Sequence, residues 1–332
     1  MVKNRRLLIS PTPNEKSGMY LYNLAKSLSE YFDIVNYGNK REPAPKELFR
    51  YLFKADIFLL NWIENEPNKS NGIFRYYMVQ LFLTIARLFN KKIIWTFHNI
   101  EPHKKRGITQ SRKIMDRLKK KSDLIVHHTT ESFSLTEKGK SFCFFHPFET
   151  KNHFNLPPAN HEYKYDILIW GAIAPYKGIA EFLQYIETDK YMSGLKIIVA
   201  GKVNDPNYKD KLEKSLSTNI DFINRFHTDE EIEILHKETR YVFYSHQGDS
   251  VLNSGQLVVS MGYGADIIGP DKGAFKELAK LGLIYTYSAF EEIPCILKNN
   301  KPTKKDLCRK FIRDHTWDKF AEGFYLQVSQ LF

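Results

Sequence analysis

Short buried strands alternate with amphipathic helices along almost the whole 332-residue chain, and this alternation restricts the fold more than any other feature. Strand-like apolar runs occupy residues 6–10, 55–60 and 92–97, and a helical period separates them, for example over residues 19–32. Strands that alternate with helices build a parallel sheet with helices on both faces. The sequence therefore predicts an α/β protein with doubly wound sheets.

A polar stretch at residues 147–165, which contains Pro157-Pro158, interrupts the alternation and is typical of an interdomain linker. The length suits two domains of roughly 150 residues each. We therefore expect one domain over 1–155 and a second over 160–310, followed by a terminal segment, 311–332. The other expected elements are strands 33–37 and 124–127 with helices 74–89 and 108–121 in the first domain, and strands 166–170, 195–200, 220–223, 241–244 and 266–270 with helices 178–187, 230–237 and 256–263 in the second.

Composition argues against several classes of protein. The three cysteines, Cys143, Cys295 and Cys308, lie far apart and lack the spacing of a zinc site or a disulfide framework, so a reducing cytoplasm fits best. The N-terminal apolar run, 7–10, is too short for the core of a signal peptide. Charged and polar residues interrupt the longest apolar stretch, 74–89, so it does not predict a membrane span.

Positive charge is concentrated in the first half of the chain. Residues 1–150 contain 26 Lys and Arg against 14 Asp and Glu, whereas the remainder contains 23 against 24. The maximum lies at 103–121, where nine basic residues accompany one acidic residue, Asp116. The first half is therefore expected to prefer an anionic partner.

The expected helix 108–121 places basic side chains around an inward face formed by Ile108, Ile114, Met115 and Leu118. Such a helix can lie on an anionic membrane surface, although a solvated basic face explains it nearly as well. The aromatic-rich run 74–89 could assist, but we expect it to be core. No RNP-like, helix-turn-helix or zinc motif supports a nucleic-acid partner.

Residues 248–278 contain the clearest signal of a ligand site. Asn253-Ser254-Gly255 opens the helix 256–263, and Gly264 ends it before a short buried strand. N–H groups at a helix start, together with the helix dipole, can hold a bound anion. The pattern predicts a diphosphate cradle, and an ordinary capped helix remains the alternative.

Further segments occur in the order of a known family. They are Ser17-Gly18 before the first helix, Trp95-Thr96-Phe97-His98-Asn99 with Glu101-Pro102-His103, the loop from Gly171 to Gly178, Leu252-Asn253-Ser254-Gly255 with Gly264, and Trp317-Asp318-Lys319-Phe320. Together with the two alternating halves, these segments resemble the GT-B fold glycosyltransferases. More narrowly, the chain is similar to the family 4 type enzymes of bacterial surface polysaccharide assembly.

This resemblance implies two Rossmann-like doubly wound domains that face a cleft, with a C-terminal helix that crosses back to the first domain. Residues 1–155 would bind the acceptor, 160–310 would bind the donor, and 311–332 would form the returning helix. The implied activity is retaining transfer of a hexose from a nucleotide-sugar to a lipid-linked saccharide or a growing polysaccharide, such as capsule or lipopolysaccharide. The implied location is cytoplasmic, including the inner face of the cell membrane.

The same resemblance assigns the donor site. Lys177 would stabilise the leaving diphosphate together with Asn253 and the amides of Ser254 and Gly255. Gly18 would let the first loop close over the acceptor or the donor phosphates, although a plain tight turn explains this glycine nearly as well. A fixed cation and helix N–H groups can stabilise the diphosphate without a metal. No acidic pair stands at a strand end; the nearest one, Glu64-Asn65-Glu66, is expected in a loop. We therefore expect neither a metal nor a cofactor, with the nucleotide-sugar as co-substrate.

Other candidates follow the carboxyl ends of expected strands, where ligands of open α/β sheets bind. By resemblance, His98 and Asn99 would contact the transferred sugar or the acceptor, although a structural strand-end histidine is the alternative. The remaining candidates are His103 and Gln247 in the acceptor and sugar cleft, Arg225 and His227 at the nucleotide, and Asp249 as an acidic contact to the donor sugar. The adjacent histidines His127 and His128 should face opposite sides of their strand, so we interpret them as structural.

The chain departs from the family pattern at three positions. Val251 and Val259 stand where many members have acidic residues that hold the donor sugar and the ribose, and Ala172 stands where Arg is usual. These losses keep a non-catalytic nucleotide-sugar-binding relative open as an alternative. A sugar-nucleotide epimerase on the same fold is a second alternative, but it would require more acid and base residues in the cleft.

Overall fold

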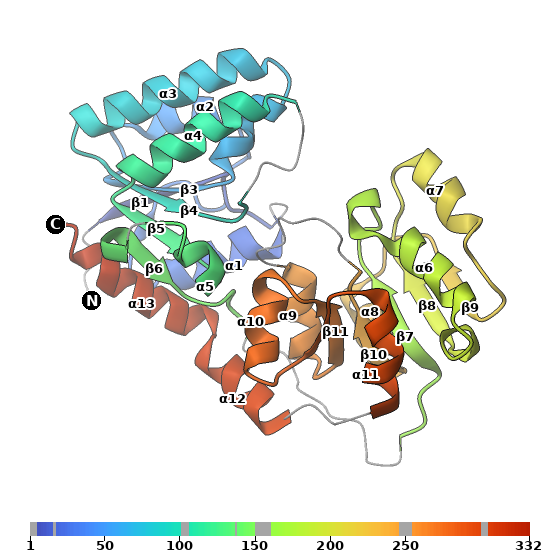
Figure 1. Ribbon diagram of the computed structural model, residues 1–332. Coiled ribbons are helices and arrows are strands. Elements are labelled where there is room, and N and C mark those ends of the chain that lie inside the picture. Colours follow the sequence, from blue (N-terminus) through green and yellow to red (C-terminus); the bar gives the residue numbers. More distant parts are fainter. Residues whose placement is uncertain are drawn as a thin grey trace. The chain divides into compact units, whose positions relative to one another are not determined.

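Two six-stranded parallel sheets organise the chain, one in each of two units (Figure 1). The computed structural model describes residues 5–15, 18–100, 106–136, 138–149, 161–245, 254–299 and 305–332. The first unit comprises Met1–Pro147 and His315–Phe332, and the second comprises Phe148–Asp314. The last helix of the chain therefore belongs to the first unit, although the second unit precedes it in the sequence.

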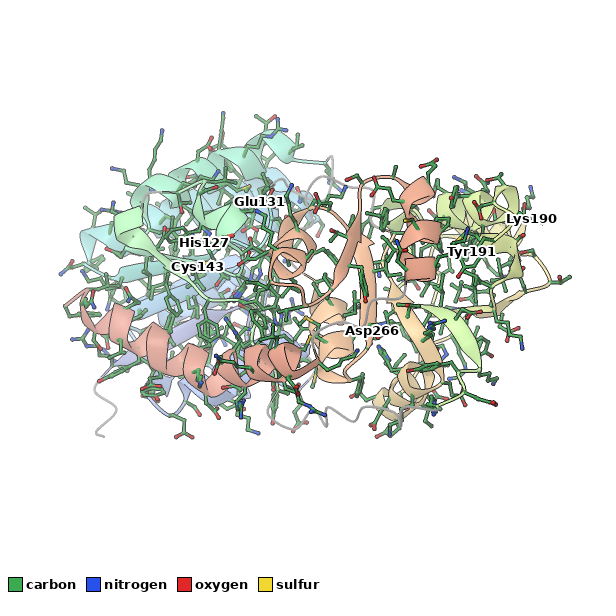
Figure 2. The ribbon with its side chains drawn as sticks, turned by 60° about the horizontal axis from the view of Figure 1, so that its bottom comes forward. His127, Glu131, Cys143, Lys190, Tyr191 and Asp266 are labelled. Atoms are coloured by element: carbon green, nitrogen blue, oxygen red, sulfur yellow. The ribbon has the colours of Figure 1, made fainter. Side chains whose placement is uncertain are left out.

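The first sheet has the strand order β2-β1-β3-β4-β5-β6, and each neighbouring pair is parallel. Its strands are β1 (Arg6–Ser10), β2 (Asp33–Ile34), β3 (Ile57–Asn61), β4 (Lys92–Thr96), β5 (Leu124–His127) and β6 (Ser141–Cys143). His127 of β5 pairs with Cys143 of β6 (Figure 2). The strand order reverses between β1 and β3, so this switch point is where a ligand of the sheet is expected.

Helices cover both faces of the first sheet, because successive strand residues point to opposite sides. Leu8 of β1 joins a core with α2, α3 and α4, whereas Leu7 and Ile9 join a core with α1 and α13. The helices are α1 (Met19–Leu28), α2 (Ala44–Tyr51), α3 (Gly72–Leu88), α4 (Ile108–Lys121), α5 (Thr130–Phe133) and α13 (Trp317–Ser329), with 3₁₀ turns at Ile63–Asn68 and Lys138–Lys140. The prediction of a C-terminal helix that returns to the first domain is confirmed.

The second sheet has the order β12-β11-β10-β7-β8-β9, again parallel, with its switch point between β7 and β10. Its strands are β7 (Tyr165–Trp170), β8 (Ile197–Ala200), β9 (Ile220–Ile223), β10 (Thr239–Phe243), β11 (Asp266–Pro270) and β12 (Tyr285–Tyr287). Its helices are α6 (Ile179–Thr188), α7 (Pro206–Glu213), α8 (Asp229–Lys237), α9 (Gly255–Gly262), α10 (Gly273–Lys280), α11 (Ile293–Asn299) and α12 (Lys305–Asp314), with 3₁₀ turns at Pro175–Lys177, Met192–Gly194 and Phe290–Glu292.

The predicted strand 33–37 is shorter in the structure, because a side chain replaces part of its backbone pairing. β2 ends at Ile34, and the buried amide of Asn36 then pairs with the backbone of Ile9. Its Oδ1 accepts from the N–H of Ile9 at 3.3 Å, and its Nδ2 donates to the carbonyl of Ile9 at 2.7 Å. The first helix likewise ends at Leu28 rather than at residue 32.

Several short elements were not predicted: α2, α5, α7, α10, α11, α12, β6 and β12. Helix α7 did have a signal in the sequence, since Asp205 caps it by accepting from the N–H groups of Asn207 and Tyr208 and Pro206 begins it. Most of these elements have eight or fewer residues, so few apolar positions reveal their period.

The expectation that the run 74–89 forms core is wrong for one side of the helix. Val79, Phe82, Leu83 and Ala86 of α3 are buried, but many apolar side chains on its other side are exposed. None of the described helices combines the length and the apolar character needed to cross a bilayer.

Candidate functional site

Lys177 lies at the switch point of the second sheet. It ends the 3₁₀ turn that follows β7, and Gly178, with φ of 64°, leads the chain into α6. The side chain of Lys177 is only 6% exposed, so it is not a solvated loop lysine. Burial lowers the pKa of its ammonium to about 8. The turn thus holds a buried cation beyond the carboxyl end of β7.

Gln256 connects this cation to helix α9. Its Oε1 accepts from Nζ of Lys177 at 2.7 Å, and its Nε2 donates to the carbonyl of Trp170 at 2.9 Å. Gly171 makes the contact possible, because a Cβ there would lie 1.3 Å from Nε2 of Gln256. Gln256 was not among the predicted site residues, because its place in the first turn of the expected helix does not reveal its contact with the distant carbonyl of Trp170.

The start of α9 is a capped helix end, as both the anion-site prediction and its alternative require. Ser254 is the N-cap, and its Oγ accepts from the N–H of Leu257 at 3.4 Å. Gly255 follows and is exposed, with no described atom within 4 Å of the place where a Cβ would stand. First-turn N–H groups lack carbonyl partners within a helix, so this end can donate to a ligand. Through Gln256, the structure brings Lys177 and this first turn together.

A buried hydroxyl anchors α9 to the surrounding elements. Oγ of Ser260 accepts from Nε1 of Trp170 at 2.9 Å and lies 2.9 Å from the hydroxyl of Tyr244. It also lies 2.8 Å from Nε2 of His236, whose Nδ1 donates to the carbonyl of Ile232. Nε2 of His236 is therefore the acceptor, and burial lowers the pKa of His236 to about 4. These bonds fix α9 relative to β7, β10 and α8.

A hollow of about 430 Å³ opens beyond the carboxyl ends of β10, β11 and β12. Ser245 is in its wall, and the hydroxyl of Ser245 donates to the carbonyl of Lys177 at 2.5 Å. The hollow therefore adjoins the turn that carries Lys177. Its lining residues are Ser245, Pro270, Asp271, Lys272, Tyr287, Ser288, Ala289 and Phe290.

The two candidate nucleotide-binding residues follow β9. Arg225 is exposed and forms a bidentate pair with Glu231, with distances of 2.7 and 2.8 Å. Glu231 also completes the capping box of Thr228 at the start of α8. His227 is half-buried, and its Nε2 has no hydrogen-bond partner among the described residues. Four other candidates, His103, Gln247, Asp249 and Asn253, lie outside the described residues, as does Val251.

His98 lies beyond β4, close to the switch point of the first sheet. Its Nε2 is 3.1 Å from Oδ1 of Asn61, and Nδ2 of Asn61 donates to the carbonyl of Ser10. Because Oδ1 of Asn61 must then accept, Nε2 of His98 carries the proton and Nδ1 is left as an acceptor. The ring stacks on Trp62 with centroids 4.2 Å apart. Burial, then His128 and His146, lower the pKa of His98 well below its usual value.

Tyr20 gathers three histidines around one ring. Its ring makes edge contacts with His98, His128 and His146, at centroid distances of 5.1 to 5.6 Å. Nδ1 of His128 donates to the carbonyl of Phe144, so Nε2 of His128 accepts from the hydroxyl of Tyr20 at 2.8 Å. Burial lowers the pKa of His128 to about 3 and that of His146 to about 4. The site around His98 in the first unit is therefore lined by neutral imidazoles.

Two further candidates in the first unit, Asn99 and Gly18, lie within the described residues. Asn99 is 8% exposed, and its buried Nδ2 has no hydrogen-bond partner in the described part of the chain. Gly18 precedes α1 with φ of 90°, a conformation that favours glycine. His127, in contrast, contacts Ser132 and Thr136, which supports the interpretation of this histidine as structural.

Glu64 is a buried acid that the sequence analysis placed in a loop. It lies in the 3₁₀ turn Ile63–Asn68, where its Oε2 accepts from Nε1 of Trp95 at 3.2 Å. Its Oε1 has no partner among the described residues, and burial raises the pKa of this carboxyl to about 7. Between pH 4.5 and 7 this carboxyl thus binds more protons in the folded state than in the unfolded state, so its own contribution to the free energy of unfolding falls as pH rises.

Glu64→Gln should remove this contribution, so the stability of the variant should rise with pH more than that of the wild-type protein does, by about 3 kcal/mol between pH 4.5 and 7.5. Urea unfolding at a series of pH values measures the slope. Glu131→Gln, at an exposed position on α5 (Figure 2), is the matched control and should keep the wild-type slope. Parallel curves for Glu64→Gln and the wild-type protein would show that Glu64 does not titrate in this range.

Among the described residues, no three His, Cys, Asp or Glu side chains lie close enough together to hold a metal ion. The two sites instead offer a buried ammonium, helix N–H groups and neutral imidazoles. These groups suit an anionic ligand in the second unit and a polyhydroxylated ligand in the first.

No protein-family model matches the sequence, and no curated protein matches it either. Solved structures match over nearly the whole length of both chains. HepE of Anabaena in complex with UDP and glucose has a TM-score of 0.66 at 13% identity, with 98% of each chain covered. A glycosyltransferase of Rickettsia africae ESF-5 has 0.66 at 10% identity, with 100% of this chain and 99% of that chain covered.

The apo form of the lipopolysaccharide outer core galactosyltransferase WaaB is similar to the same degree. Its TM-score is 0.67 at 12% identity, with 98% of this chain and 99% of that chain covered. At these identities the similarity establishes the fold. The chain has two Rossmann-like domains of the GT-B type, as the resemblance predicted.

Proposed function

We propose that this chain is a glycosyltransferase that moves a hexose from a nucleotide-sugar donor to a glycan acceptor. One observation carries the proposal: the buried ammonium of Lys177 is held at the first turn of α9, at the switch point of the second sheet. HepE, which shares this fold, has been crystallised with UDP-glucose. A nucleoside diphosphate is the anion that such a corner would receive.

The chemistry follows from where charge develops. As the bond between C1 of the sugar and the phosphate oxygen breaks, its electron pair stays on the diphosphate. The ammonium of Lys177 and the N–H groups of Gly255 and Gln256 would stabilise that charge. The acceptor hydroxyl then bonds to C1, and its proton passes to the departing diphosphate oxygen, which holds the electron pair of the broken bond. The hollow beside Ser245 is next to this corner and could hold the sugar.

His98 suits a different task. Its Nδ1 is an acceptor and its ring stays neutral, so it can accept a hydrogen bond from a sugar or acceptor hydroxyl. Asn99 adds a buried donor without a partner among the described residues. We propose that these two side chains orient the hydroxyl-bearing substrate, and that Arg225 and His227 contact the nucleotide.

The acceptor class is also part of the proposal. A lipid-linked saccharide or a growing surface polysaccharide would bring the protein to a membrane, where the basic helix α4 suits an anionic surface. WaaB, which acts in the lipopolysaccharide outer core, offers a parallel on the same fold. Retention at C1 is proposed from the family resemblance.

A panel of nucleoside diphosphates, UDP first, tests the donor site by thermal shift. Because a ligand at 100 times its Kd stabilises the folded state by about 2.7 kcal/mol, one member of the panel should raise Tm by several degrees. The matching nucleotide-hexose should then be turned over, slowly with water and faster with an acceptor glycan.

The outcomes separate the alternatives. Nucleotide binding without any turnover of the donor would favour a non-catalytic relative, the alternative that Val259 and Ala172 keep open. Rearrangement of the donor sugar without transfer would favour an epimerase. If no nucleoside diphosphate changes Tm, the assignment of the corner at Lys177 is wrong.

A further inference from the structure

Helix α3 displays a continuous apolar stripe to solvent. Ile73, Tyr77 and Leu81 follow one another at intervals of four residues and Leu88 comes seven residues later, so they lie on one side of the helix. Leu88 is 78% exposed, and Ile73, Phe74 and Tyr77 are each more than 60% exposed. The stripe consists of Ile73, Phe74, Tyr77, Leu81 and Leu88, and Phe53 packs edge-on against Phe89 near its end.

The stripe is long, and the opposite side of the same helix is core. With 17 residues, α3 extends for about 25 Å. Val79 and Phe82 bury the inner side against the sheet, so apolar residues lie on both the inner and the outer side of the helix. Single exposed apolar residues are ordinary on a protein surface, but a contiguous patch of this kind marks an interaction site.

The basic helix α4 lies beside α3 (Figure 1). Arg117 of α4 bridges them, because it donates to the carbonyl of Gln80 at 2.9 Å and to Oγ1 of Thr84 at 2.8 Å. At the N-terminal ends of the two helices, Phe74 and Arg106 line a common hollow of about 600 Å³. The apolar stripe and the basic helix therefore belong to one surface.

The charge of this surface is strongly one-sided. Residues 69–121, which include both helices, contain fourteen Lys and Arg but only two acidic residues, Glu101 and Asp116. The rest of the first 150 residues is balanced, with twelve of each sign. The exposed basic side chains near the stripe are Arg87, Arg106, Arg112, Lys113, Lys120 and Lys121.

We propose that α3 inserts its apolar stripe into the interface of an anionic lipid bilayer while α4 and its neighbours bind the headgroups. This deepens the proposed function, on which it rests for the membrane-linked acceptor, because it names the element that enters the membrane. Apolar side chains flanked by Lys and Arg are the pattern of helices that lie in a membrane interface. A second copy of the chain fits this surface less well, because its own basic residues would approach these without compensation.

Vesicle flotation tests the inference with the full chain. Vesicles of phosphatidylcholine with 30% phosphatidylglycerol are the probe, at low salt and at 0.5 M NaCl, where surface charges are largely screened. The variant Ile73→Ser, Tyr77→Ser, Leu88→Ser should bind at least about tenfold more weakly at both salt concentrations. The variant Lys113→Glu, Lys120→Glu, Lys121→Glu should lose most binding at low salt and change little at high salt.

A control removes three exposed leucines elsewhere: Leu281→Ser, Leu307→Ser, Leu326→Ser. This control should bind vesicles as the wild-type protein does. The inference would be overturned if the wild-type protein bound vesicles only as weakly as the α3 variant. It would also be overturned if the α3 variant bound vesicles as strongly as the wild-type protein. A wild-type dimer that the α3 substitutions dissociate while vesicle binding stays the same would overturn it as well.

Nucleoside diphosphate binding keeps the two proposals apart. None of these substitutions touches the corner at Lys177, so all three variants should show the wild-type thermal shift with the nucleotide. If the α3 variant loses vesicle binding but keeps the thermal shift with the nucleotide, the substitutions have affected the membrane contact of α3 and not the nucleotide site. If the wild-type protein shows no thermal shift with any nucleoside diphosphate, the proposed function is contradicted. The vesicle result still tests the role of α3 by itself.

Discussion

Lys177→Met should abolish nucleoside diphosphate binding and reduce the proposed sugar transfer by at least about a hundredfold, the scale of losing one preorganised charge contact. Methionine keeps an unbranched apolar stem in a site that is 6% exposed, so the fold should survive. The measurements are the thermal shift with UDP and the initial rate of donor turnover. Lys211→Met is the control, because this exposed lysine in the same unit pairs with Glu181 on the surface.

The pH dependence of binding adds a second readout. The pKa of Lys177 is lowered to about 8, so its ammonium is present at pH 7 and is lost as pH rises above 8. Because only the ammonium attracts a diphosphate, affinity should fall by up to about tenfold per pH unit above that value. Equal affinity at pH 7 and 9.5, or wild-type binding by Lys177→Met, would show that this cation does not hold the ligand.

Mild acid should unfold the protein, because several histidines are buried in neutral form. Burial lowers the pKa of His127, His146 and His236 to about 4 and that of His128 to about 3. The unfolded state binds more protons below pH 6.5, so stability is lost as pH falls from 6.5 towards 4. Each histidine contributes about 3 kcal/mol to this loss, and the set rivals the whole stability of a domain.

The raised pKa of Glu64 stabilises the folded state as pH falls, but it offsets only about as much of the loss of stability as one histidine contributes. Three of the four histidines, and His98 as well, belong to the first unit, so that unit should unfold first. Near-UV circular dichroism and tryptophan fluorescence during an acid titration measure this. Trp62, Trp95 and Trp317 report on the first unit and Trp170 on the second. A native spectrum at pH 4 would contradict the prediction, as would earlier loss of the Trp170 signal.

The alternating pattern was sufficient to predict two doubly wound sheets, because strands buried on both faces leave long apolar runs in any sequence that forms them. The same reasoning failed at β2. There, the amide of Asn36 replaces backbone pairing with Ile9, a substitution that no periodicity reveals. It also failed for α3, whose inner and outer sides are both apolar, so the hydrophobic pattern could not show which side the core would take.

The residues of the candidate site also differ in whether the sequence alone could identify them. Lys177, Ser254 and Gly255 could be chosen from the sequence, because a turn after a strand and a small-residue helix start have local signatures. Gln256 could not, since its role depends on the carbonyl of Trp170, 86 positions earlier, and on the space left by Gly171.

Local order along the chain thus settled the class of fold and the segments where ligands are expected, since these depend on periodicity and on residues adjacent in sequence. Contacts between distant residues settled the protonation of His98, the buried state of Lys177 and the exposure of the α3 stripe. Solvent exclusion and hydrogen-bond partners determine those properties, and both arise only after the elements have packed together.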